Sequence, residues 1–433
     1  MRINIKNIKL KMNLKQFSCI ITTVIFTSLP LFSIAQSSAK DSIKLSVYGF
    51  VKNDLFWDTR QTVAARENHF LLFPKPASLD ANGDDINNAG SFNFLSIQSR
   101  IGLTVSGAKF LNANASAKIE ADFFGQSNVN INLLRLRHAF IKLNWTSTEL
   151  LIGQYWIPMF IPECFPGTIS FNTGVPFQPF GRNPQIRLSH QLGKVKLIAI
   201  ANSQRDYTSI GPDPSVPTSS ISSGQFLMNS GMPELSAQAH FVPNKIIIIG
   251  ASASYKKIVP QLVTPQNYAT QESVGGYNAL VFAKIKTKNI TFKLQGIYGQ
   301  NMADVLSIGG IAISDSTEKV KGYVKYTTLN TASAWIDIQT NGTKIQVGIF
   351  GGYSKNLGAN TQVIGPKYGL GTNIESMYRI SPRISYTFKQ LKFAIEGEYT
   401  VANYGSTYDS NAIPTNITPA SNFRLLFSTY FMF

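Results

Sequence analysis

The chain has 433 residues, and its 40 Lys and Arg against 23 Asp and Glu give a formal net charge of +17. Beyond residue 35 it contains no run of about 18 consecutive apolar residues, which excludes a helical membrane protein. Its two cysteines are too few for a disulfide-stapled secreted domain. No nucleic-acid-binding motif or lysine-rich tail accompanies the positive charge, so we expect no nucleic-acid partner.

Residues 1–35 have the pattern of a secretory signal peptide. Five basic residues and no acidic one occupy the first 15 positions, an apolar stretch follows, and Ser33-Ile34-Ala35 forms a small-x-small cleavage motif. We expect cleavage after Ala35 and export through the inner membrane. An uncleaved anchor is the alternative, but the stretch is short and is interrupted by Pro30. Residues 36–433 would then form a single unit with a net charge of +12.

Alternating apolar and polar residues predict β-strands throughout this unit. The first strand is expected at about 43–58, and the alternation is clearest in 94–106, 113–123 and 378–388. One face of each segment carries mainly Leu, Ile, Ala and aromatic residues, whereas the other carries charges, amides and hydroxyls. Strands of this kind are typical of a wall with lipid on one side and a wet interior on the other.

Short turns and long loops alternate along the chain. Tight turns are expected at 109–112, 146–148, 192–194, 242–245, 286–289, 340–343 and 388–390. Long polar stretches lie between them, at about 60–91, 157–182, 203–232, 257–272, 301–319, 355–371 and 403–419. This rhythm predicts an all-β fold, a closed transmembrane antiparallel barrel of about 16 strands with both termini at the periplasm. Fourteen or eighteen strands also fit, because 320–340 could be one long strand or two short ones.

The loop at about 157–182 is expected to fold into the lumen as a constriction. The surrounding stretch, 153–190, holds six prolines, which prevent helix and ladder formation, and five phenylalanines, whose rings need burial. A barrel of this size has a lumen wide enough for water, and its inner wall could bury those rings. An exposed external loop is the alternative.

The same stretch resembles the DcaP-like family of outer-membrane porins. The resemblance rests on Gly153-Gln154-x-Trp156, Pro162, Phe165-Pro166-x-Thr168, Phe171-Asn172, Arg182 and Pro184-Gln185-Ile186-Arg187. It extends more weakly through the first and last strands, and beyond about residue 203 only the rhythm matches. It implies a trimeric barrel of sixteen strands with an inward loop and a cationic constriction for small dicarboxylates. The apolar segment "IPMFIPECF" departs from the family pattern.

Arginines on the polar faces of the strands are the candidate solute-selecting residues. In "LLRLRHAF", Leu134, Leu136 and Phe140 are expected to face lipid. Arg135 and Arg137 would then point into the lumen, because arginine on the lipid face near the midplane costs about 2–4 kcal/mol. The expected constriction residues are Arg100, Arg135, Arg137, Arg182, Arg187, Arg379 and Arg383. Guanidinium groups in a narrow channel raise the local anion concentration and bind carboxylates bidentately.

Two observations leave the role of these arginines open. Arg424 in the last strand also falls on an inward face. The same inward faces carry Glu120, Asp122, Glu396 and Glu398. The arginines could therefore be structural braces for these acids rather than contacts for a solute.

The chain ends on an aromatic strand, "NFRLLFSTYFMF" (422–433). One face of this strand carries Phe423, Leu425, Phe427, Thr429, Phe431 and Phe433. In a closed barrel the last strand pairs with the first and leaves no open edge, whereas a terminal strand of a soluble sandwich is the alternative. The final Phe433 is similar to the signal that barrel-assembly machinery reads on outer-membrane proteins, and this resemblance implies that machinery as a partner.

These patterns predict a homotrimeric porin in the outer membrane of a diderm bacterium. Small hydrophilic solutes, preferentially anionic ones such as carboxylates, would diffuse through it passively. Three alternatives remain: a non-conducting barrel that serves as adhesin or scaffold, a transporter of hydrophobic compounds, and a soluble secreted β-protein.

We expect no enzyme activity, no cofactor and no metal. No nucleophile elbow, phosphate loop or paired-carboxylate motif occurs in the sequence. The four histidines, His69, His138, His190 and His240, lack metal-ligand spacing. His138 and His190 are expected on the lipid side of their strands.

Overall fold

The computed structural model describes residues 43–125 and 127–433. The expected signal peptide, 1–35, and its cleavage after Ala35 lie outside the described residues. Within the described ranges, no helix is both long and apolar enough to cross a bilayer.

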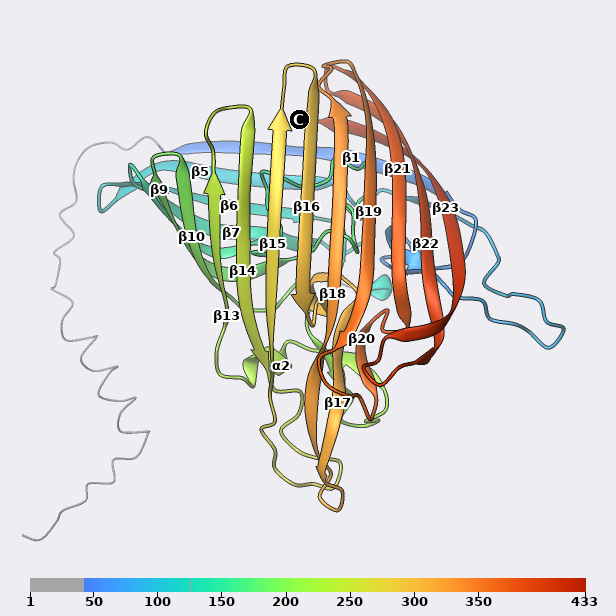
Figure 1. Cartoon of the computed structure of the whole chain (residues 1–433). Coiled ribbons are helices and arrows are strands. Elements are labelled where there is room, and N and C mark those ends of the chain that lie inside the picture. Colours follow the sequence, from blue (N-terminus) through green and yellow to red (C-terminus); the bar gives the residue numbers. More distant parts are fainter. Residues whose placement is uncertain (1–42, 126) are drawn as a thin grey trace, which may run out of the picture. The chain divides into compact units, whose positions relative to one another are not determined.

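Sixteen strands of residues 43–433 pair in antiparallel fashion around a closed ring (Figure 1). In ring order they are β1 (Lys44–Asp58), β5 (Arg100–Phe110), β6 (Ala113–Asp122), β7 (Arg135–Asn144), β8 (Thr148–Trp156), β9 (Arg182–Leu192), β10 (Val195–Asn202), β13 (Glu234–Phe241), β14 (Ile247–Ile258), β15 (Val274–Lys286), β16 (Ile290–Gln300), β18 (Tyr323–Thr340), β19 (Ile345–Ala359), β21 (Ile374–Phe388), β22 (Leu391–Tyr408) and β23 (Pro414–Met432). The predicted all-β barrel is therefore confirmed.

Shorter elements lie in the connections between these strands. They are β2 (Thr62–Ala65), β3 (Phe70–Pro74), β4 (Ser91–Leu95), η1 (Asn128–Asn130), β11 (Ile210–Pro212), β12 (Ser220–Ser222), α2 (Gln225–Met228), η2 (Ala303–Val305), β17 (Gly309–Glu318) and β20 (Lys367–Leu370). The β2–β3 and β11–β12 pairs are separate hairpins, whereas β4, β17 and β20 extend the ladders of ring strands.

The last strand closes the ring on the first. β1 pairs with β23 from Phe50↔Met432 to Asp58↔Arg424, and its first half pairs with β5. The backbone N–H of Gly49 donates to the carbonyl oxygen of Phe433 at 2.9 Å, and the N–H of Phe433 donates back at 3.1 Å. The aromatic C-terminal strand therefore has ladder partners on both sides and leaves no open edge.

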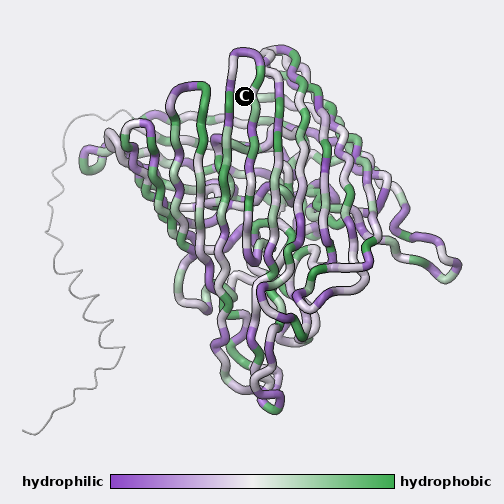
Figure 2. Tube along the Cα trace, in the orientation of Figure 1, coloured by the Kyte–Doolittle hydropathy of each residue, from purple (hydrophilic) through white to green (hydrophobic). Residues whose placement is uncertain are grey.

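The barrel wall is apolar outside and polar inside. Along β23, Phe423 and Leu425 are 43% and 42% exposed, whereas Arg424 and Ser428 are buried. Figure 2 shows the same alternation of hydrophobic and hydrophilic residues along the neighbouring strands. This is the pattern of a transmembrane barrel, because lipid-facing and lumen-facing residues alternate with a period of two.

All seven expected tight turns lie at one end of the ring, which we call the short-turn end. It carries the turns that join β5–β6, β7–β8, β9–β10, β13–β14, β15–β16, β18–β19 and β21–β22. The C-terminus lies at this end, at the top of Figure 1. The other end, the long-loop end, carries the longer connections, and there β17 and the first part of β18 project beyond the neighbouring strands (Figure 1).

The structure settles one open strand assignment and corrects one expected loop. The range 320–340, left open by the sequence, contains one strand of 18 residues, β18. The long loop expected at 403–419 is wrong, because β22 continues to Tyr408 and β23 begins at Pro414. The polar residues of this range pair as strand beyond the apolar part of the wall, so polarity there did not indicate a loop.

A charged lumen narrowed by two inserted segments

Residues 157–181, between β8 and β9, fold into the barrel as the expected inward loop. Four of its five phenylalanine rings are at most 4% exposed, namely those of Phe160, Phe171, Phe177 and Phe180. The Phe160 ring stacks on Trp156 with centroids 3.9 Å apart. The indole N–H of Trp335 on β18 donates to Gln178 at 2.8 Å. The loop thus reaches from β8 to the wall formed by β18 and β19.

Glutamates on β22 hold the middle of this loop. The Glu396 carboxylate accepts hydrogen bonds from the backbone N–H groups of Ile169 and Ser170. Glu398 accepts a hydrogen bond from the Asn172 side chain at 2.7 Å. Both carboxylates are fully buried. These inward acids therefore fix the loop rather than face a passing solute.

A glycine on β19 makes room for the loop. A Cβ on Gly352 would lie 2.5 Å from the Phe177 ring, closer than real Cβ atoms approach. The ring centroid of Phe177 also lies 6.2 Å from that of Phe350, which is on β19 like Gly352. The loop therefore packs directly on the strand backbone.

A second segment, around β3, also enters the lumen, and sequence reasoning missed it. Phe70, Leu71, Leu72 and Phe73 are all at most 5% exposed. The hydroxyl of Tyr404 on β22 donates to the carbonyl oxygen of Pro74 at 2.6 Å. This segment lies in the stretch 60–91, which was expected to be an external loop. The apolar run "FLLF" within that polar stretch was the available signal.

Arg379 joins both inserted segments to the wall. Its guanidinium donates to the carbonyl oxygen of Val175 in the inward loop at 2.8 Å and to that of Leu72 at 2.9 Å. It also lies 3.9 Å from the Glu398 carboxylate, and its side chain is fully buried. Arg379 is inward as expected, but its contacts are those of a brace.

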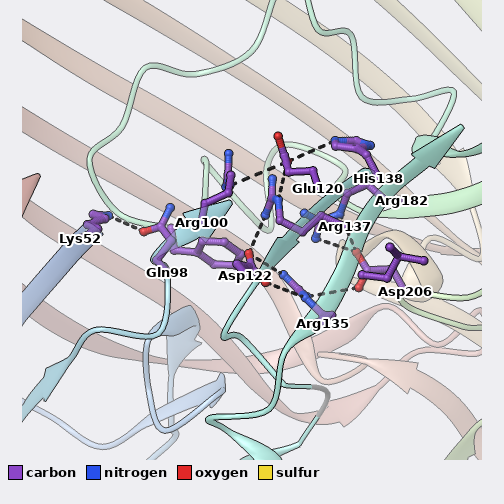
Figure 3. Close-up of polar contacts among 12 residues, drawn as sticks. Lys52, Gln98, Arg100, Glu120, Asp122, Arg135, Arg137, His138, Arg182 and Asp206 are labelled. Carbon is purple, nitrogen blue, oxygen red and sulfur yellow. Dashed lines mark hydrogen bonds and ion pairs between the residues drawn. The ribbon is translucent and has the colours of Figure 1, made fainter. Parts of the chain in front are cut away.

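Four of the other predicted arginines gather at one side of the lumen (Figure 3). Arg137 donates to Glu120 at 2.8 Å and to Asp122 at 2.9 Å. Arg135 donates to Asp122 at 3.2 Å, and Arg182 donates to Asp206 at 2.7 Å. We call the four arginines (Arg100, Arg135, Arg137 and Arg182), Lys118 and the carboxylates of Glu120, Asp122 and Asp206 the arginine cluster. Its carboxylates hold most of the guanidinium groups in fixed positions.

Asp206 was not singled out from the sequence. It lies in the connection that follows β10 and contacts both Arg135, at 3.4 Å, and Arg182. Burial alone would raise the pKa of this carboxyl, but the two guanidinium groups outweigh burial and lower its pKa. Asp206 therefore stays ionised at neutral pH and completes the cluster.

Arg100 is the most exposed of the seven predicted arginines. Its side chain is 19% exposed, and its Nε atom lies 3.8 Å from Glu120, too far for a hydrogen bond. Its guanidinium lies over the Phe50 ring at 4.9 Å. Lys118 lies beside it, 3.4 Å from the same carboxylate and 29% exposed. Arg100 and Lys118 are thus the most exposed cations of the cluster.

The remaining two predicted residues lie on other parts of the wall. Arg187 on β9 donates to the Gln238 side chain at 2.9 Å. Arg383 on β21 pairs with Asp337 at 2.8 Å and donates to Gln339 at 3.1 Å. The structure therefore brings Arg100, Arg135, Arg137 and Arg182 together and separates the other three from them. Contact of any of the seven with a solute stays a prediction.

A β-bulge corrects the expected side-chain directions at the centre of β7. Glu120 pairs with His138 and Ala121 pairs with Leu136, so Arg137 is an extra residue in the ladder. Beyond it the alternation is inverted. His138 is consequently buried, and Phe140 lies opposite the inward Lys118. The lipid-side assignment of these two residues was wrong, whereas His190 is exposed on the outer side as expected.

Comparison with known proteins identifies the fold of the chain but no related sequence. No family model and no curated protein matches the sequence. The outer-membrane channel DcaP of Acinetobacter baumannii is similar in structure, with a TM-score of 0.64 at 16% identity over 91% of this chain and 99% of that one. The fold is that of the outer-membrane porins.

Two further porin-fold structures cover this chain almost as fully. An anion-selective porin from Comamonas acidovorans has a TM-score of 0.53 at 9% identity, over 90% of this chain and 100% of that one. The trimer form of OmpT from Vibrio cholerae has a TM-score of 0.50 at 10% identity, over 91% and 100%. A porin fold with an apolar outer wall is an outer-membrane architecture, and the expected location is confirmed.

Proposed function

We propose that the chain is a passive diffusion channel for small hydrophilic solutes with a mild preference for anions. The observation that carries the proposal is the charge of the arginine cluster. Its five cations are Arg100, Lys118, Arg135, Arg137 and Arg182, and its three carboxylates are those of Glu120, Asp122 and Asp206. The surplus positive charge lies on the two exposed members, where it would attract anions to the narrowed lumen.

Bilayer electrophysiology tests this proposal directly. With purified protein in a planar bilayer under a KCl gradient, the reversal potential is expected to have the sign of chloride preference. Liposome swelling is expected to be faster with a small carboxylate than with a cation of equal size. Cation preference would refute the anion selectivity, and a folded protein without conductance would favour the adhesin or scaffold alternative.

Exchange of the exposed arginine should reduce the selectivity without unfolding the barrel. Arg100→Gln removes a charge that makes no hydrogen bond to its nearest carboxylate, Glu120, so we expect the anion-to-cation permeability ratio to fall by about twofold. Lys344→Gln, in an exposed turn at the short-turn end, removes the same charge outside the cluster and should leave the ratio unchanged. A ratio that responds equally to both substitutions would contradict a selective role for Arg100.

The proposal also covers how the chain assembles, how it reaches the membrane and whether it acts as an enzyme. We infer a homotrimer, in keeping with the trimer form of the Vibrio cholerae protein that shares the fold. We also infer that the strand ending at Phe433 is read by the barrel-assembly machinery, and that a cleaved signal peptide precedes the barrel. The protein would transport solutes without acting as an enzyme. Chemical cross-linking in isolated outer membranes tests the trimer.

A further inference from the structure

Lysines line a polar pocket inside the short-turn end of the barrel. The pocket has a volume of about 340 Å³, and three of its lining residues are Lys284 and Lys286 on β15 and Lys293 on β16. Glu163 and Phe165 of the inward loop form another part of its wall, and Gln339 contributes an amide. The pocket therefore lies between the inward loop and the short-turn end of the lumen, and it shares no lining residue with the arginine cluster.

The strand register brings two of these lysines face to face. Lys284 is directly opposite Lys293 in the β15–β16 ladder, and Lys286 is opposite Thr291 one inward position nearer the turn. Directly opposed side chains of a ladder have Cβ atoms about 4.5–5.5 Å apart, and like charges at that spacing repel. An anion between the two ammonium groups would turn this repulsion into attraction.

Of the three lysines that line the pocket, only Lys293 has a carboxylate partner. Lys293 lies 3.7 Å from Asp337 and donates to the carbonyl oxygen of Phe165 at 2.9 Å. Asp337 is shared with Arg383, which lies closer, at 2.8 Å. Among residues 43–125 and 127–433, Lys284 and Lys286 have no ion-pair partner.

Glu163 reduces the positive charge of the lining but does not cancel it. One of its carboxylate oxygens is buried without a hydrogen-bond partner in the described structure. Its single negative charge faces the three ammonium groups of the lining. The surplus suits a ligand with at least two negative charges, and each ammonium group can donate up to three hydrogen bonds to it.

We propose that this pocket is a binding site for small polyanions, which carry two or more carboxylate or phosphate charges. The inference rests on the proposed channel function and adds a second anion site to it. A polyanion held there would occupy the conduction path and slow the flow of chloride. The site faces the short-turn end, so solutes that arrive from that side reach it without passing the inward loop.

Block of the chloride current tests the site. Citrate and pyrophosphate, added in separate experiments to each side of the bilayer, are expected to block more strongly from the side of the short turns. The variant Lys284→Gln/Lys286→Gln should weaken that block at least about tenfold, because charge-assisted hydrogen bonds to the ligand are lost. Block by citrate alone would assign the site to carboxylates, and block by pyrophosphate alone would assign it to phosphates.

A matched control uses lysines of the adjoining turns. Lys288 and Lys344 are exposed and do not line the pocket, so Lys288→Gln/Lys344→Gln removes the same charge and should leave the block unchanged. Equal block in wild type and in Lys284→Gln/Lys286→Gln would overturn the inference while leaving the channel function intact.

A binding measurement separates failure of the site from failure of the channel. Calorimetric titration of the folded protein in detergent with pyrophosphate or citrate requires no current. Binding that the Lys284→Gln/Lys286→Gln variant loses would support the site even in a protein that does not conduct. Absence of binding of both anions to the wild-type protein would overturn it.

Discussion

Replacement of residues 158–179 by a short glycine–serine linker is expected to raise the single-channel conductance about fivefold, because a sixteen-stranded barrel without an inserted loop encloses an aqueous channel. Trp156 and Arg182 are direct neighbours in the β8–β9 ladder, so a short linker can join the two strands. The change also removes the rings of Phe160, Phe171 and Phe177 from the lumen. Single-channel recording in a planar bilayer measures the effect.

The same linker in place of residues 80–84 provides the control. That segment is exposed in the connection between β3 and β4, and its exchange should leave the conductance unchanged. Heat-modifiable migration shows whether each variant is folded. A folded inward-loop variant with wild-type conductance would show that the segment around β3, and not the inward loop, limits the flow.

The barrel was predictable because its signals are local. The turn "KTKN" (286–289) and its six equivalents were found from short polar segments of the sequence, and each lies between two consecutive strands of the ring. The inward direction of Arg379 and Arg424 followed from alternation, since the strand register is unbroken at both residues. Proline and phenylalanine content was enough to place the inward loop.

The parts that could not be predicted depend on contacts distant in sequence. Asp206 meets Arg135 across 71 residues, and no local pattern distinguishes it from other loop aspartates. The bulge at Arg137 inverts the alternation at His138, because one extra residue changes which face the following side chains occupy.

The contacts of the lumen cations also depend on residues distant in sequence. Arg137 and Arg379 are held by hydrogen bonds that brace the lumen, whereas Arg100 makes no hydrogen bond to its nearest carboxylate. Lys284 and Lys286 have no ion-pair partner within residues 43–125 and 127–433. On the sequence alone, arginine and lysine at inward positions are equivalent, because only the register shows which of them have a carboxylate opposite. The exposed lysines, rather than the buried arginines, would then set the selectivity at the short-turn end.

The ion pair at the barrel seam should show the largest effect of a single substitution on stability. Asp58 on β1 lies directly opposite Arg424 on β23, so the pair joins the first strand to the last. Arg424 donates to the two carboxylate oxygens at 2.9 and 2.6 Å, and both side chains are at most 1% exposed. Its guanidinium also lies 4.4 Å from the Phe56 ring.

Loss of one partner leaves a buried charge without its counter-ion, so Arg424→Leu or Asp58→Leu should each lower the free energy of unfolding by about 3–5 kcal/mol. The double variant removes both charges and should recover much of that loss, since an apolar pair of similar volume is often neutral. Urea unfolding in lipid vesicles, followed by tryptophan fluorescence and heat-modifiable migration, measures the three variants. Phe423→Leu, on the outward face of the same strand, is the control. Single variants within about 1 kcal/mol of the wild type would match an exposed ion pair and contradict the role of this pair in closing the barrel.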